Sequence, residues 1–147
     1  MGVDLKMEQD RYFIDQLSFV EKVVVYDDGN VHVYEKNNSE YAVIIEAFSA
    51  MLEGYREMPA FGVSLHEEVE NAKKSGLWIE FCYESIYIHE EMPYERLLIG
   101  LEKGDRGFNL MRFCRGRYEG RCFYVDLNFE TTKFIETLEF VRKLASL

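Results

Sequence analysis

The chain has 147 residues, 48% of them hydrophobic and 30% charged, and carries a formal net charge of −10 at pH 7. A composition this apolar, with only two prolines, excludes a disordered or low-complexity chain, and the length suits one domain with a buried core. The negative charge disfavours binding to nucleic acids and to anionic membranes. We therefore expect a single domain over residues 1–147, with no nucleic-acid or membrane partner.

The number and spacing of the cysteines, together with the N-terminal sequence, predict the cellular compartment. Cys82, Cys114 and Cys122 are odd in number and lack CxxC spacing, which argues against a disulfide framework. The N-terminal residues contain no apolar segment typical of a signal peptide, and no apolar run approaches the roughly 20 residues of a membrane helix. We expect a cytoplasmic protein whose three cysteines are free thiols.

The strongest local signal is a β-hairpin over residues 19–36. Asp28-Gly29 suits a two-residue type I′ turn, because both central residues of that turn need a positive φ. Such a turn would place Lys22 opposite Glu35. Their opposite charges favour this register, because cross-strand ion pairs stabilise a sheet.

A helix is expected over residues 39–57, where apolar side chains recur on one face at a period of about 3.6 residues. These apolar residues are Tyr41, Ile44, Ile45, Phe48, Leu52 and Tyr55. Asn37 or Ser39 would cap the N-terminus of this helix, and Pro59 would end it. Residues 1–18, by contrast, carry only a thin helical pattern.

Two further helices are predicted. A surface helix would begin at Ser64, which opens a capping-box sequence, and would stop at Gly76. A closing helix over residues 130–145 has a continuous apolar face, and Glu139 and Lys143 add an i,i+4 ion pair in the favoured order.

Residues 77–127 are expected to form antiparallel strands, because only short loops separate them. The strands would cover residues 77–83, continued or restarted at 86–89, then 96–102, 108–115 and 121–127, with turns at 103–107 and 116–120. This order predicts an α+β fold: a single antiparallel β-sheet, made by the N-terminal hairpin and the C-terminal meander, packed on one face by the first and last helices. The expected core includes Ile44, Phe48, Leu52, Ile79, Phe81, Leu138 and Val141.

No catalytic or metal-binding motif is recognised. His66 and His89 each precede two glutamates but lack the second histidine of a zinc-protease helix. Glu80 and Glu84 share a strand face, but about 13 Å of strand would separate them, and we expect both to face solvent. We therefore expect no metal and no cofactor, leave enzymatic activity open, and keep Cys114, which lies among arginines, as an alternative nucleophile.

One basic segment stands out in this acidic chain, since five arginines lie between residues 105 and 121. Arg115, Arg117 and Arg121 bracket the second turn of the meander and would converge at its tip. Their guanidinium groups could hold a carboxylate or phosphate, with Tyr118 as a stacking face. The alternative is that these arginines pair with acidic residues elsewhere on the surface.

Two classes of function follow. The first is a non-enzymatic binding or regulatory domain, whose partner would be a basic protein attracted by the net charge, or a second copy on the open sheet face. The alternative is a small anionic-ligand-binding protein or enzyme that uses the arginine-rich meander and the sheet face. The first class predicts an exposed apolar or acidic patch, and the second predicts a concave pocket with convergent polar groups.

Overall fold

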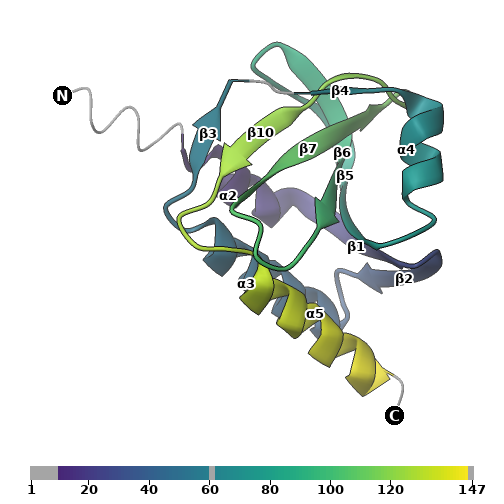
Figure 1. Ribbon diagram of the computed structural model, residues 1–147, viewed down its shortest axis with the longest axis vertical. Coiled ribbons are helices and arrows are strands. Elements are labelled where there is room, and N and C mark those ends of the chain that lie inside the picture. The colour runs from purple at the N-terminus through teal and green to yellow at the C-terminus, as the bar shows by residue number, and fades with distance from the viewer. Residues whose placement is uncertain (1–9, 60–61, 146–147) are drawn as a thin grey trace.

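The computed structural model describes residues 10–59 and 62–145 (Figure 1). In chain order the elements are α2 (Tyr12–Gln16), the 3-10 helix η1 (Leu17–Phe19), β1 (Val20–Asp27), β2 (Asn30–Glu35), α3 (Ser39–Leu52), β3 (Arg56–Met58), β4 (Val63–Ser64), α4 (His66–Ala72), β5 (Leu77–His89), β6 (Met92–Leu101), β7 (Gly107–Cys114), β8 (Arg117–Tyr118), β9 (Gly120–Arg121), β10 (Phe123–Asp126) and α5 (Thr132–Ala145). The thin helical pattern at the N-terminus corresponds to α2 and η1, and its residues 1–9 lie outside the described part.

The predicted α+β class is confirmed. The described strands form one eight-stranded antiparallel sheet in the order β2-β1-β5-β6-β7-β10-β3, with β8 pairing β7, and a separate pair made by β4 and β9. The hairpin register is also confirmed, because Lys22 pairs with Glu35. Asp28 and Gly29 form its tip with φ angles of 48° and 88°, as a type I′ turn requires.

The main core lies between the sheet and the helix pair α3 and α5, which run side by side in Figure 1. Side chains of both helices join the same buried cluster as the inward-facing residues of β1, β5, β6, β7 and β10. All seven core residues expected from the sequence are buried: Ile44, Phe48, Leu52, Ile79, Phe81, Leu138 and Val141. The apolar periodicity therefore identified a buried face in α3, β5 and α5 correctly.

The first long helix ends earlier than predicted, at Leu52 rather than at residue 57. Gly54 adopts a φ of +75°, a left-handed conformation that ends helices readily because glycine has no Cβ. Tyr55 then turns into the core, and residues 56–58 become the edge strand β3. The expected cap was also wrong, since Asn38 occupies the N-cap position.

The second helix does not begin at Ser64. Ser64 belongs to β4, and its buried hydroxyl lies 3.3 Å from the thiol of Cys122, so it cannot serve as a cap. Leu65 takes the N-cap position and α4 starts at His66.

The second turn of the meander also differs from the one expected at residues 116–120. The chain reverses at Arg115 and Gly116, whose φ angles of 53° and 84° make a tight two-residue turn before β8.

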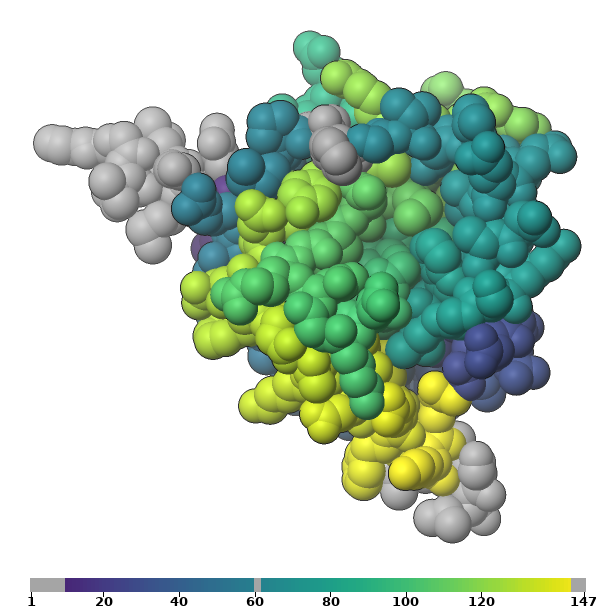
Figure 2. All heavy atoms as spheres, viewed as in Figure 1, coloured from purple at the N-terminus to yellow at the C-terminus, as the bar shows by residue number. Residues whose placement is uncertain are grey.

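The opposite face of the sheet is partly covered by α4, which lies at the edge of the view in Figures 1 and 2. Val69 of α4 packs there against Leu98 and Tyr118. The expectation that Glu80 faces solvent is wrong, because Glu80 is 0% exposed beneath this cover, whereas Glu84 is exposed as predicted. None of the described helices is long and apolar enough to span a membrane.

Candidate functional site

The structure separates the predicted arginine cluster. Arg115 lies at the exposed tip of the β7–β8 turn, where its backbone N–H donates to the Glu95 carboxylate at 2.9 Å. The exposed Arg117 guanidinium instead pairs with Glu119 at 2.8 Å, which raises the pKa of Arg117. Arg117 therefore follows the alternative in which an arginine pairs with a surface acid.

Tyr118 cannot offer a stacking face to a ligand, because its ring is 0% exposed. Its hydroxyl donates to the Glu80 carboxylate, which also accepts a hydrogen bond from the Tyr26 hydroxyl at 2.7 Å. Lys73 donates to the Tyr118 hydroxyl at 3.0 Å. Burial, and next the charge of Glu80, raise the pKa of both tyrosines, so the phenols stay protonated and keep donating. Tyr118 thus belongs to a buried structural network.

Arg121 is the one predicted site residue that lines a cavity. Its carbonyl accepts a hydrogen bond from Arg112 Nε at 2.7 Å, which fixes the backbone of β9. Its side chain borders a cavity of about 320 Å³ that Asp10, Glu57 and Glu90 also line. Among the described residues, the charged members of this lining are therefore three acids and one arginine.

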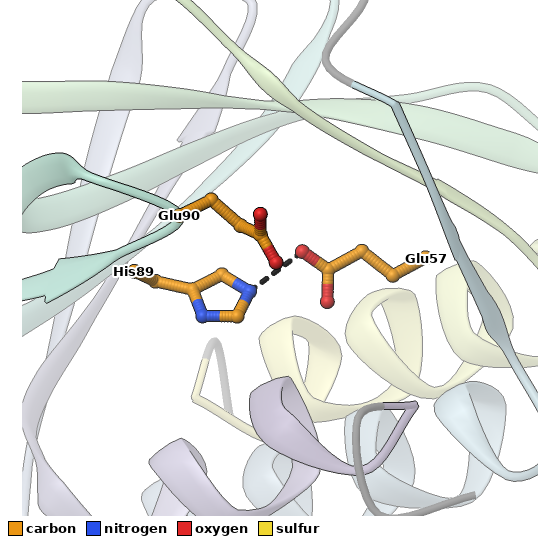
Figure 3. A group of neighbouring side chains, drawn as sticks. All are labelled: Glu57, His89 and Glu90. Atoms are coloured by element: carbon orange, nitrogen blue, oxygen red, sulfur yellow. Dashed lines mark hydrogen bonds and ion pairs between the residues drawn. The ribbon is translucent and has the colours of Figure 1, made fainter. Parts of the chain in front are cut away.

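Next to this cavity, three potential metal ligands point toward one another (Figure 3). Glu57 comes from β3, His89 from the end of β5, and Glu90 from the turn that follows. One ligand atom of each residue lies within 4.8 Å of the other two. His89 Nε2 and Glu57 Oε1 are 2.6 Å apart, and their side chains are only 15% and 12% exposed.

The imidazole of His89 is held by aromatic rings on several sides. The Tyr12 ring stacks on it with centroids 3.7 Å apart and planes 8° from parallel. Phe13 contacts it edge-on, and Phe123 packs against it at a tilt, both with centroids 5.3 Å away. This packing fixes the ring plane, so Nε2 is directed toward Glu57 before any ligand arrives.

Curling of the sheet makes the contact between His89 and Glu57 possible. β6, β7 and β10 lie between β5 and β3 in the strand order. In a flat sheet the two strands would be about 19 Å apart, at roughly 4.8 Å per strand spacing. The observed 2.6 Å contact requires the sheet to bend back on itself, with Phe13, Tyr94 and Phe123 filling the inside of the bend.

Glu90 owes its position to an unusual turn. Glu90 and Glu91 both have positive φ angles, 51° and 66°, between the paired residues His89 and Met92. Two-residue turns of this kind usually take Asn-Gly or glycine, because a left-handed backbone costs about 1–2 kcal/mol for other residues. The turn places the Glu90 carboxylate close to the Glu57 carboxylate and to the His89 imidazole.

One imidazole nitrogen and two carboxylates form a donor set suited to a divalent transition metal such as Zn²⁺ or Mn²⁺. Ligand atoms bound to one ion at about 2.1 Å lie at most about 4.2 Å apart. The three ligand atoms lie within 4.8 Å of one another, and an ion between them would replace the 2.6 Å hydrogen bond that joins His89 Nε2 and Glu57 Oε1. Asp10 accepts a hydrogen bond from the backbone N–H of Glu57 at 3.2 Å and so helps to hold that ligand's backbone in place.

The sequence analysis did not bring these three residues together, and its expectation of no metal site stays a prediction. His89 and Glu90 were visible as neighbours, but Glu57 is 32 positions from His89 and was assigned to the end of a helix. Glu57 could be assigned to the edge strand β3 only once α3 was known to end at Leu52. A weak signal was available in Glu90-Glu91, which occupies a two-residue hairpin tip without glycine or asparagine.

A second surface feature is a groove between α3 and α5, with a volume of about 770 Å³. Its lining includes Ala47, Ala50, Met51, Phe129 and Phe134, together with the charged residues Glu53, Arg106, Glu130 and Lys133. Val43 lies one helical turn before the lining residue Ala47, and Phe140 lies one turn after the lining residue Thr137, so each shares a helix face with a residue of the groove. Val43 and Phe140 are 44% and 59% exposed.

Comparisons of the chain with protein-family models, with curated proteins and with solved structures find no match.

Proposed function

We propose that this protein binds a divalent transition-metal ion through Glu57, His89 and Glu90. The observation that carries the proposal is the convergence of the three donor atoms within 4.8 Å at the edge of a cavity. Separate elements supply them, and two of the three side chains are largely withdrawn from water. The sequence suggested a binding domain of unknown specificity, and we propose a metal ion as its ligand.

The charge of the cavity favours a cation over the anion that the arginine-rich meander suggested. In the described part of the lining, Asp10, Glu57 and Glu90 oppose the guanidinium of Arg121, which gives these four residues a formal balance of −2. An ion of charge +2 would neutralise that balance, and carboxylates brought together repel one another without it. A concave site with convergent polar groups was the feature expected of a ligand-binding protein, and this cavity has it.

Isothermal titration calorimetry with ZnCl₂ and with MnCl₂ tests the proposal. The parent should bind one equivalent of at least one of these ions. Glu57→Gln and His89→Gln should each weaken binding by at least about tenfold, because even loss of an outer-shell partner typically costs 10–100-fold in metal affinity. Binding should also raise the melting temperature of the parent, since a ligand that binds only the native state stabilises it.

Glu91→Gln provides the matched control. Glu91 has the same charge, the same turn and the same left-handed backbone as Glu90, but it is not among the converging ligands. Its replacement should leave the affinity within about twofold, as expected for a surface charge that touches no bound ion. Equal weakening by Glu91→Gln and Glu57→Gln, or no binding of either ion by the parent, would refute the site.

A second function is supported by the groove between α3 and α5. We also propose that this groove binds an amphipathic helix of a partner protein that carries basic residues beside its apolar face. Exposed Val43, Phe129 and Phe140 offer an apolar surface around the groove, and helix-in-groove recognition uses apolar anchors of this kind. The net charge of −10 attracts a basic segment and disfavours an acidic one.

A fluorescent basic amphipathic peptide and its acidic counterpart of equal hydrophobicity test the groove. The basic peptide should bind more tightly, and Ala50→Glu, in the lining of the groove, should weaken that binding. Leu65→Glu is the control, because Leu65 is exposed on the other side of the fold beside α4. Equal binding of both peptides, or insensitivity to Ala50→Glu, would contradict the proposal, and a dimer in sedimentation experiments would make a second copy the occupant instead.

A further inference from the structure

We infer that the cavity beside Glu57, His89 and Glu90 takes a small oxyanion, a carboxylate or a phosphate-like group, which bridges the bound metal ion and Arg121. The inference rests on the proposed metal binding and adds a second ligand to the same site. It gives Arg121, one residue of the predicted arginine cluster, a binding role in this cavity rather than at the tip of the meander turn.

The first observation is the state of the Arg121 side chain. It is exposed and lines the cavity together with three carboxylates. Among the described residues, no carboxylate lies within 4.0 Å of its guanidinium, whereas Arg117 and Arg142 each have such a partner. A guanidinium group presents several N–H donors in a planar fork, which matches the oxygens of a carboxylate or phosphate. Arg121 is therefore available to an anion that enters the cavity.

The second observation is electrostatic, and it sets an order of binding. Without metal, the cavity lining has a formal balance of −2, which repels an anion. A divalent ion at Glu57, His89 and Glu90 would bring that balance to zero. The anion should therefore bind the metal-loaded protein and not the metal-free one. Linkage then requires the anion to tighten metal binding by the same factor, which is typically about 5- to 150-fold.

The third observation is room for the anion. Three protein ligands leave at least one position open on a four-coordinate ion, as catalytic zinc sites do. The cavity volume of about 320 Å³ equals that of about ten water molecules at roughly 30 Å³ each, ample for sulfate or acetate. An oxyanion can therefore coordinate the ion at one end and meet the Arg121 fork at the other.

The experiment measures Mn²⁺ affinity from the electron paramagnetic resonance signal of free Mn²⁺. Titrations are run in sodium sulfate, in sodium acetate and in sodium chloride at equal ionic strength. Sulfate stands in for a phosphate-like ligand and acetate for a carboxylate. In the parent, at least one of the two oxyanions should tighten Mn²⁺ binding by about fivefold or more relative to chloride. Arg121→Gln should remove that tightening, so that Mn²⁺ binds the variant with the same affinity in the oxyanion buffer as in chloride.

Arg117→Gln is the control variant, since Arg117 is another exposed arginine, four residues away, that pairs with Glu119. It should keep the full effect of the oxyanion. Retention of the effect in Arg121→Gln, its loss in Arg117→Gln, or sulfate binding by metal-free protein would each overturn the inference while leaving the metal site intact. Failure of the parent to bind Mn²⁺ or Zn²⁺ at all would instead refute the proposed function.

Discussion

Replacing Tyr118 with phenylalanine should destabilise the fold substantially, because it removes a hydrogen bond to a buried carboxylate. Glu80 is 0% exposed and accepts from two phenols, those of Tyr118 and Tyr26. Arg96 lies 4.0 Å away, at the limit of an ion pair. Loss of the Tyr118 hydroxyl leaves one carboxylate oxygen without its donor in a place that bulk water does not reach.

The magnitude follows from that loss. Hydrogen bonds to charged groups contribute about 1.5–3 kcal/mol, and an unsatisfied buried acceptor costs about as much, so we expect Tyr118→Phe to lower the free energy of unfolding by about 2–3 kcal/mol. With a urea m-value near 2 kcal/mol/M, the midpoint should fall by about 1–1.5 M. Tyr26→Phe should cost only about 1 kcal/mol, because Tyr26 is partly exposed and water can replace its hydroxyl.

Urea unfolding followed by circular dichroism measures both values, and a double-mutant cycle isolates the interaction. In a Glu80→Gln background, Tyr118→Phe should cost clearly less than in the parent, because the charged acceptor is gone. A cost below about 0.5 kcal/mol for Tyr118→Phe, typical of a neutral surface change, would refute this reasoning. So would an equal cost in the two backgrounds.

Three further predictions concern the core, the thiols and pH. Phe48→Ala should lower the free energy of unfolding by about 3–5 kcal/mol in the same urea assay, because Phe48 is 2% exposed among the rings of Phe81, Phe108 and Phe134; a midpoint that barely moves would contradict its place in the core. Thiol titration of denatured, unreduced protein should find three thiols, and in native protein Cys82 should react slowly at pH 8, because burial raises its pKa to about 11; rapid reaction of all three would contradict its burial. Burial also raises the pKa of Tyr83, Tyr94 and Tyr118 above their ordinary value of 10.0. Above about pH 10 the unfolded chain therefore binds fewer protons than the native one, and stability should fall as pH rises, less steeply in Tyr118→Phe; a flat profile from pH 9 to 11.5 would contradict this.

Tertiary structure decided what the sequence signals left open about individual side chains. Strict alternation would place Glu80 and Glu84 on the same face of one strand and make them equivalent. The structure buries Glu80 under α4 and β8 and leaves Glu84 in water. Tyr118 was similarly assigned to a surface turn, but the reversal at Arg115 and Gly116 moves it into the sheet and under this cover.

The sequence by itself determined those features that depend on residues close together in the chain. The turn at Asp28 and Gly29 specified the hairpin register, because only a two-residue loop with positive φ fits there. Apolar periodicity identified a buried face in α3, α5 and β5, because the spacing of apolar residues within one element shows which of its sides packs into the core. The metal-ligand group depends instead on a sheet that curls until β5 meets β3 across three intervening strands. That curl is the sum of strand twist, an irregular pairing within β5 and β6, and aromatic packing between distant segments, and no short stretch of sequence contains it.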